Sequence, residues 1–232
     1  MDEIADRVTR YLGHRMPHAE GLEVSDIRRF HGGASRETYR MTIRYREGGE
    51  RLERGIVLRR DPPSTLIETE GQLEFAAYRA FHPTRVPVPE PLHLEEDESW
   101  LERPFFIMEE VPAGEAGAPF DADPYGERRE IVGRQFWEIL GHIHAQDPGK
   151  LGLNAVMEAP APEDCWRREL DYWESVLDAD ELEPQPIVRG AIRHLRANPP
   201  PPAQRVVTVH GDYRNGNFLA DDDGNVRAVL DW

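Results

Sequence analysis

Strand patterns and helix patterns occupy different parts of this 232-residue chain. Residues 38–45 alternate apolar and polar side chains, which predicts a half-buried strand. The Gly48-Gly49 pair predicts a turn, and residues 52–60 have the composition of the next strand. Apolar residues at helical spacing mark residues 131–144 instead. We therefore expect an α+β fold in which an N-terminal antiparallel sheet precedes a mainly helical region.

A segment rich in Gly, Ala and Pro, residues 114–124, separates the two patterns. We place a lobe boundary there, which gives an N-terminal lobe at residues 1–112 and a C-terminal lobe at residues 113–232. Within the C-terminal lobe, apolar spacing predicts further helices at residues 166–177 and 187–196.

The acidic composition excludes several kinds of partner. The formal net charge is −16, and both nucleic acids and anionic membranes require clustered positive charge, so we expect neither as a partner. Cys165 is the only cysteine, so no disulfide can form within the chain. The acidic N-terminus does not resemble a signal peptide, and no apolar run approaches the roughly 20 residues that span a bilayer. These features predict a cytoplasmic protein and leave its oligomeric state open.

A dense group of polar residues, His-Gly-Asp-Tyr-Arg-Asn-Gly-Asn, occupies residues 210–217. It follows an apolar strand predicted at 205–209 and precedes a predicted hairpin, after which Asp231 comes directly. Phosphoryl transfer needs one carboxylate to accept the proton of the attacking hydroxyl, and an amide and a second carboxylate to hold Mg²⁺. Asp212 or Asn217 alone would be explained more simply as a turn or cap residue. Their order on a strand–loop–hairpin frame favours the catalytic interpretation.

These motifs resemble those of the aminoglycoside phosphotransferase family, whose fold is similar to that of protein kinases. Residues 210–212 (His-Gly-Asp) with Asn217 are similar to the family's catalytic loop, and residues 230–232 (Leu-Asp-Trp) to its metal-binding motif. The resemblance implies a bilobal kinase-like fold and either ATP or GTP as the phosphate donor. It also implies that Asp212 is the catalytic base and that Asn217 and Asp231 are Mg²⁺ ligands.

One subgroup resembles this chain most, the one related to the kinase-like domains of acyl-CoA dehydrogenase-associated proteins. Residues 57–63 and 210–217 carry that similarity. Family members continue beyond the Leu-Asp-Trp motif into a helical region that walls the substrate pocket. The resemblance therefore implies either that this chain is a fragment or that the helical region was trimmed or lost.

Gly32, Gly33 and Ser35 lie between two predicted strands. Small residues allow backbone N–H groups to approach phosphates, but a Gly-Gly hairpin turn is the commoner explanation of such a sequence alone. The resemblance implies a loop that covers the nucleotide phosphates, in which Ser35 either donates to a phosphate or caps the turn.

The family's third strand supplies a cation to the α- and β-phosphates, and this chain has Arg59 and Arg60 there instead of a lysine. Arginine can bind phosphate through two donors. Alternation places Val57 and Arg59 on one face, so we expect Arg59 to face the nucleotide and Arg60 to be a surface cation. Apolar residues at helical spacing predict a helix at residues 66–81, Glu74 lies on its apolar face, and the resemblance also indicates Glu74 as the partner of Arg59. Glu70, one turn earlier, remains an alternative.

Met108, Glu109 and Val111 belong to a segment that resembles the family's connection between the lobes. The resemblance implies that backbone groups of this segment bind the purine edge, with Met108 behind it. A core strand that ends at a loop explains the same residues equally well.

The expected function is a Mg²⁺-dependent kinase that moves the γ-phosphate of ATP or GTP to a hydroxyl of a small molecule. An aminoglycoside-like acceptor would suit the acidic charge, whereas the subgroup resemblance suggests a hydroxylated metabolite or acyl compound. The alternative is a nucleotide-binding module without catalytic activity, because the cation is not lysine and the chain ends at Trp232. A protein kinase is disfavoured, because protein kinases have His-Arg-Asp and Asp-Phe-Gly in the two motifs.

Overall fold

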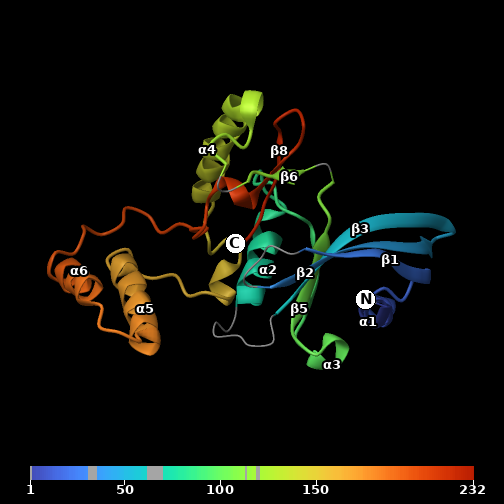
Figure 1. Ribbon diagram of the computed structural model, residues 1–232, viewed down its shortest axis with the longest axis horizontal. Helices are drawn as coiled ribbons and strands as arrows, with labels where there is room; N and C mark the ends of the chain where they lie inside the picture. Colours follow the sequence, from blue (N-terminus) through green and yellow to red (C-terminus); the bar gives the residue numbers. More distant parts are fainter. Residues whose placement is uncertain (1, 31–35, 62–69, 113, 119–120) are drawn as a thin grey trace. The chain divides into compact units, whose positions relative to one another are not determined.

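The structure is a computed structural model that describes residues 2–30, 36–61, 70–112, 114–118 and 121–232 (Figure 1). Gly32, Gly33 and Ser35, predicted to cover the nucleotide phosphates, lie outside these residues. The chain forms two compact units. The first unit comprises Met1–Ala145 and Val209–Trp232, and the second unit comprises Gln146–Thr208. This partition differs from the lobe boundary after residue 112, which stays a prediction.

A five-stranded antiparallel sheet with the order β1-β2-β3-β5-β4 dominates the first unit. Its strands are β1 (Glu20–Phe30), β2 (Glu37–Glu47), β3 (Glu50–Arg60), β4 (Pro91–Glu95) and β5 (Phe105–Glu109). The alternation predicted for residues 38–45 is confirmed, because the apolar side chains in β2 are buried and those between them are only partly so. Gly48 and Gly49, at φ values of 59° and 87°, make the predicted turn between β2 and β3.

Helices α1 (Asp2–Arg15) and α2 (Glu70–Phe81) cover opposite faces of this sheet (Figure 1). Tyr11 of α1 packs in one core with Leu58 of β3, whereas Tyr78 of α2 packs in a second core with Val57. Successive strand residues point to opposite faces, so the two cores lie on the two sides of β3. The short helix α3 (Glu98–Leu101) connects β4 to β5.

A small sheet with the order β6-β7-β8 carries the end of the chain. Its strands are β6 (Glu115–Ala116), β7 (Phe218–Ala220) and β8 (Val226–Val229), and the predicted hairpin between β7 and β8 is confirmed. Helix α4 (Arg129–Ala145) lies beside it, with the ring of Phe136 centred 4.9 Å from that of Phe218. The strand predicted at 205–209 is wrong, since all five residues are described and form none. Apolar composition favours a strand but does not supply a hydrogen-bonded neighbour, and this segment pairs with neither sheet of the described residues.

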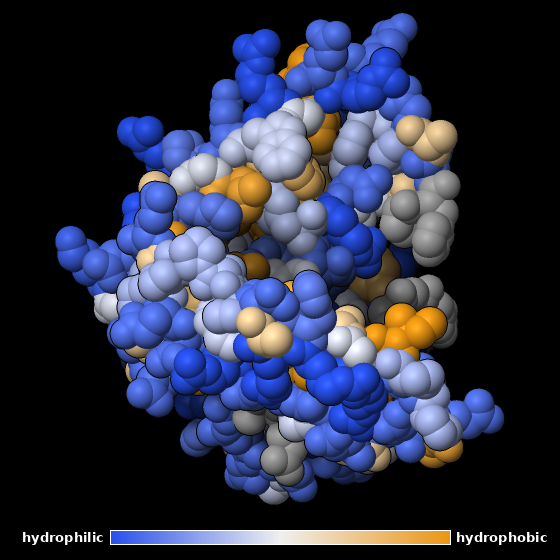
Figure 2. Space-filling view, turned by 90° about the vertical axis from the view of Figure 1, so that its left-hand side faces the viewer, coloured by the Kyte–Doolittle hydropathy of each residue, from blue (hydrophilic) through white to orange (hydrophobic). Residues whose placement is uncertain are grey.

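The second unit contains the two predicted helices, α5 (Cys165–Asp180) and α6 (Pro186–Ala197). Surface ion pairs join them, among them Arg189 with Asp178 at 2.5 Å and Arg196 with Asp171 at 2.6 Å. Hydrophilic side chains cover most of the face seen in Figure 2, and apolar ones form small separate groups. Among the helices of the described ranges, none has both the length and the hydropathy of a bilayer-spanning segment.

Candidate functional site

A buried ion pair joins the sheet to α2. Nη1 of Arg59, near the end of β3, lies 2.5 Å from Oε1 of Glu74, whose side chain is only 1% exposed. Strand alternation directs Arg59 to the α2 face, where Val57 also packs. The Tyr78 hydroxyl, one helical turn after Glu74, donates to the same Oε1 at 2.8 Å. The predicted pairing of Arg59 with Glu74 is therefore present, while their roles toward a nucleotide stay predictions.

Arg60 points to the opposite face of the sheet. Its Nη2 lies 2.5 Å from Oε2 of Glu37, and its Nη1 donates to the carbonyl of Leu101 at 3.2 Å. Its side chain is only 13% exposed, so the expected surface cation is in fact a largely buried one held by Glu37. The side chain of Glu70, the alternative partner of Arg59, lies outside those that the structure describes.

A second arginine, which sequence analysis missed, contacts the other oxygen of Glu74. Nη1 of Arg36 lies 2.5 Å from Glu74 Oε2, and its Nε donates to Oδ1 of Asp61 at 2.9 Å. In the β2–β3 hairpin Glu37 pairs with Arg60, so the next position on each strand brings Arg36 beside Asp61. No motif marks Arg36, but this hairpin register was a signal that could have found it.

Asp231 reaches Arg59 from the end of β8. Its Oδ1 lies 2.5 Å from Arg59 Nη1, and its side chain is 49% exposed. Its backbone N–H donates to the Tyr78 hydroxyl at 3.2 Å. Its φ of 59° lies in the left-handed region, which is costly for a residue other than glycine and is found often at functional sites.

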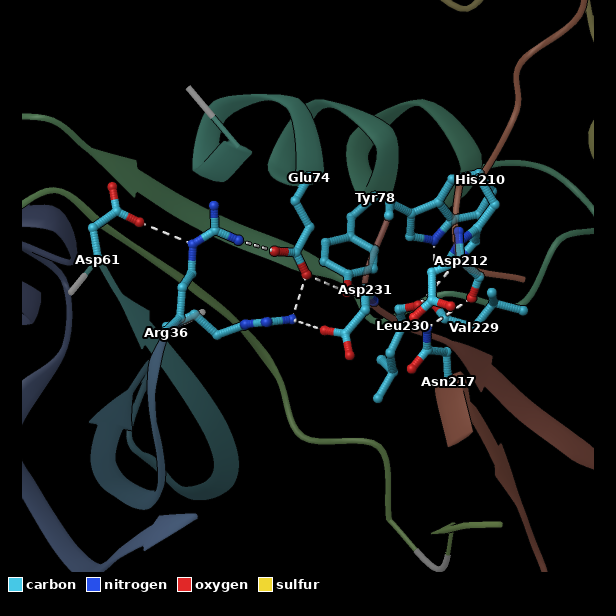
Figure 3. Close-up of polar contacts among 12 residues, drawn as sticks. Arg36, Asp61, Glu74, Tyr78, His210, Asp212, Asn217, Val229, Leu230 and Asp231 are labelled. Carbon is cyan, nitrogen blue, oxygen red and sulfur yellow. Dashed lines mark hydrogen bonds and ion pairs between the residues drawn. The ribbon is translucent and has the colours of Figure 1, made fainter. Parts of the chain in front are cut away.

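Five charged side chains consequently form a chain of ion pairs that alternate in sign, and Figure 3 labels Asp61, Arg36, Glu74 and Asp231 among them. They are Asp61, Arg36, Glu74, Arg59 and Asp231. Burial lowers the pKa of Arg59, but the carboxylates of Glu74 and Asp231 raise it by a larger amount. The net shift is upward, so Arg59 stays a cation. Burial raises the pKa of Glu74, and the guanidinium groups of Arg59 and Arg36 oppose that increase.

The loop at residues 210–217 folds Asn217 back onto Asp212. Nδ2 of Asn217 donates to the backbone carbonyl of Asp212 at 2.8 Å and to its Oδ2 at 3.0 Å. Nε of Arg214 donates to both oxygens of the Asp212 carboxylate, and this interaction lowers the pKa of Asp212. The backbone N–H of Leu230 donates to the Asn217 carbonyl at 2.8 Å, which holds Asp231 next to the loop (Figure 3). The structure thus brings the three predicted oxygen-bearing residues into one region.

His210 connects this loop to the end of β8. Its Nε2 lies 2.9 Å from the carbonyl of Leu230, and its Nδ1 lies 3.3 Å from the backbone N of Asp212. A neutral ring with the proton on Nε2 satisfies both contacts, and burial lowers the pKa of His210, which favours the neutral form. Its ring centre lies 4.8 Å from that of Trp232, which stacks on Phe81 of α2 at 4.4 Å. His210 therefore organises the loop.

The predicted nucleotide-base segment continues from β5. Met108 is buried and pairs in register with Val57 of β3. The backbone N–H of Glu109 donates to the carbonyl of Glu90 at 2.9 Å, so the protein itself uses that group. The N–H of Val111 has no acceptor within the described ranges, which leaves it for a ligand. Purine binding by this segment stays a prediction.

Two side-chain oxygen atoms, one of Asp231 and one of Asn217, suit a hard divalent cation. No donor from the described part of the chain reaches Oδ2 of Asp231 or Oδ1 of Asn217. Mg²⁺ takes such oxygens, keeping several waters and using only one or two protein ligands. Nε of Arg59 is also buried without an acceptor among the described residues, so it can donate to an anion. Nowhere in those ranges, including this site, do three His, Cys, Asp or Glu side chains group as metal ligands.

Comparison with known proteins relates this geometry to a family. Residues 26–232 match the phosphotransferase enzyme family. The chain is 29% identical over 231 residues to acyl-CoA dehydrogenase family member 10 of Mus musculus. The aligned region covers 98% of this chain and 20% of that protein. It is 26% identical over 209 residues to acyl-CoA dehydrogenase family member 11 of Gallus gallus, covering 89% and 25%. The chain thus spans a fifth to a quarter of these relatives.

Solved structures share the fold. A candidate aminoglycoside phosphotransferase from Ralstonia eutropha matches with a TM-score of 0.69 and 26% identity, over 97% of this chain and 64% of that one. Macrolide 2'-phosphotransferase type I matches with a TM-score of 0.60 and 15% identity, over 100% and 70%. The GDP complex of aminoglycoside 2'-phosphotransferase-IIIa matches with a TM-score of 0.56 and 12% identity, over 98% and 72%. The last two likenesses show the fold alone, and together the comparisons confirm the predicted kinase-like α+β fold.

Proposed function

Because the chain belongs to the phosphotransferase enzyme family, we propose that it binds a nucleoside triphosphate with Mg²⁺ and transfers the γ-phosphate to a hydroxyl of a small molecule. The contact between Arg59 and Asp231 carries this proposal. It joins a strand cation held by Glu74 to the aspartate beside the 210–217 loop. The proposed donor is ATP or GTP, and a similar solved structure is a GDP complex.

Asp212 is the proposed base. Its side chain is 56% exposed and its pKa is lowered by Arg214, so it is ionised at neutral pH and accessible to a substrate. Arg214 holds the carboxylate through both oxygens, and Asn217 donates to one of them. The carboxylate would accept a hydrogen bond from the substrate hydroxyl and orient its oxygen toward the γ-phosphorus. It would take the proton as the new P–O bond forms and the bond from the γ-phosphorus to the departing nucleoside diphosphate breaks.

The other residues would position the nucleotide. Asn217 and Asp231 would hold Mg²⁺, which when bound neutralises charge on the phosphates. Arg59 would donate to the α- and β-phosphates, and Gly32, Gly33 and Ser35 would contribute backbone or hydroxyl donors. In this scheme catalysis is mainly positioning and electrostatic stabilisation.

The relatives suggest two classes of acceptor. Similar structures include aminoglycoside and macrolide phosphotransferases, whereas similar curated proteins are acyl-CoA dehydrogenase family members. We therefore propose a hydroxylated small molecule, either aminoglycoside-like or an acyl metabolite. A panel containing both classes, assayed with ATP and with GTP, separates them.

Replacing Asp212 by asparagine tests the proposal. Titration calorimetry should show that the variant still binds Mg²⁺–nucleotide, while phosphate transfer falls by about a hundredfold or more, because the proton acceptor is lost. Asp222→Asn, in the exposed turn between β7 and β8, is the matched control and should keep full transfer. Unchanged transfer by Asp212→Asn would refute the base assignment. Nucleotide binding without transfer in the unaltered chain would favour a binding module instead.

A further inference from the structure

We propose that Arg36 is a positioning residue, which holds the second carboxylate oxygen of Glu74 and thereby fixes Arg59 and Asp231 for the Mg²⁺–nucleotide. The inference deepens the proposed function and rests on it for the identity of the ligand. Arg36 precedes β2 directly and belongs to neither of the two motifs near the end of the chain.

The two oxygens of Glu74 have different partners. Oε1 is shared by Arg59 at 2.5 Å and by the Tyr78 hydroxyl at 2.8 Å. Oε2 is contacted by Arg36 at 2.5 Å, and by no other side chain of the described ranges. The carboxylate is buried, so water cannot replace a lost partner there. Without Arg36, Glu74 would rotate to satisfy Oε2, and the Oε1 contact would change with it.

Arg36 is itself held rigidly. Its Nε donates to Asp61 at 2.9 Å, and its side chain is 7% exposed. Two parts of one planar guanidinium group thus engage two carboxylates, which sets the plane of the group as well as its position. Lysine has a similar charge but no planar fork, so it could reach one of these carboxylates and not keep both contacts.

The position of Glu74 affects Asp231 by two routes. Arg59 Nη1 lies 2.5 Å from each of the two carboxylates, so it is shared between them. A firmly held Glu74 keeps Arg59 in place when Asp231 exchanges that contact for a cation. The Tyr78 hydroxyl, which donates to Glu74, also accepts the backbone N–H of Asp231 at 3.2 Å. Arg36 thus supports both the strand cation and the backbone of the metal-binding residue.

Arg60 provides a matched control. It is also a largely buried arginine of the same sheet, paired with a glutamate at 2.5 Å, but it lies on the opposite face. Arg60→Gln should therefore reproduce the general effect of removing a buried arginine without disturbing Glu74.

Four variants of the full chain test the inference: Arg36→Gln, Arg60→Gln, Glu74→Gln and the double variant of Arg36 and Glu74. Hydrogen exchange without nucleotide, read by mass spectrometry on a peptide covering residues 226–232, should be faster in Arg36→Gln than in Arg60→Gln. Calorimetry with Mg²⁺–ATP and Mg²⁺–GTP should show binding weakened on the order of tenfold in Arg36→Gln, as for other supporting residues around a metal. The double variant should bind no more weakly than Glu74→Gln, because Arg36 acts through Glu74.

Several results would overturn the inference. Exchange at residues 226–232 that is equal in Arg36→Gln and Arg60→Gln would show that Arg36 does not support Asp231. Additive losses in the double variant would show that Arg36 acts independently of Glu74. If Arg36→Gln does not fold, Arg36→Lys takes its place and should give an exchange rate at residues 226–232 between that of the wild type and that expected for loss of the contact with Glu74. Exchange at the wild-type rate in Arg36→Lys would show that the positive charge alone holds Glu74, without the planar group. Failure of the unaltered chain to bind either nucleotide would refute the proposed function, while the exchange comparison would still decide the role of Arg36.

Discussion

Replacing Glu74 by glutamine removes the negative charge between two buried arginines. Glutamine has the same length and keeps one carbonyl oxygen, so the packing of α2 is retained while the charge is lost. The side chains of Arg36 and Arg59 are only 7% and 11% exposed, so neither can recover solvation by water. We therefore expect a large loss in the free energy of unfolding.

The structure sets the size of this loss. Removing one partner of a buried ion pair costs about 3–5 kcal/mol. Asp61 and Asp231 remain beside the two arginines and glutamine keeps an acceptor, so we expect the lower end, about 3 kcal/mol. With a urea dependence of about 2 kcal/mol per molar, the unfolding midpoint should fall by about 1.5 M.

Urea titration followed by far-ultraviolet circular dichroism measures this effect. Glu53→Gln is the control, since Glu53 pairs with Arg44 at 2.7 Å but its side chain is 62% exposed. Loss of such an exposed pair should cost less than about 1 kcal/mol. Equal midpoints for Glu74→Gln and Glu53→Gln would refute the reasoning, because burial would then make no difference to the value of the charge.

Three further substitutions test other parts of the site. Asp231→Asn retains an oxygen for Arg59 but loses the negative charge. Calorimetric Mg²⁺ titrations at fixed nucleotide should therefore show Mg²⁺ binding weakened on the order of tenfold. An unchanged Mg²⁺ dependence would contradict the role of Asp231 as a ligand. Gly211→Ala should lower the free energy of unfolding by about 1 kcal/mol, because the φ of 88° at this position disfavours any residue with a side chain. Steric contact adds nothing to this cost, since no atom lies within 4 Å of the new Cβ. An unaltered urea midpoint would contradict a left-handed backbone conformation at Gly211. The pKa of His210 is lowered by burial, so its stabilising contribution is complete above its ordinary pKa and is lost as the pH falls toward the folded value. The unfolding free energy should therefore fall more between about pH 7.5 and about pH 5.5 in the wild type than in His210→Asn, and parallel decreases would exclude a protonation effect at this residue.

Local periodicity predicted the parts of the fold whose side chains repeat regularly. The apolar alternation of β2 marked a strand, and the same alternation in β3 assigned Arg59 and Arg60 to opposite faces. Helical spacing placed Glu74 on the buried side of α2. Each of these inferences needs only the direction of a side chain from its own element, which the sequence supplies.

Partners that are distant in sequence could not be predicted in this way. The hairpin register could have placed Arg36 beside Asp61, but its contact with Glu74 spans 38 positions, and nothing in the sequence near either residue marks that contact. Arg60 was expected at the surface because alternation gives the face of the sheet to which its side chain points. Alternation does not reveal that Glu37 lies on that face and pairs with Arg60. The apolar segment 205–209 has strand composition, yet a strand also needs a hydrogen-bonded neighbour, and composition alone does not supply one.

The arginine at position 59 also affects how this protein can be detected. The chain contains a single lysine, Lys150, which belongs to the second unit, so the first unit has no lysine side chain. Reactive nucleotide analogues that acylate a lysine amine beside the phosphates would find no acceptor next to Glu74. A survey based on that acylation would therefore find no target lysine in the first unit, even if the proposed nucleotide site is filled.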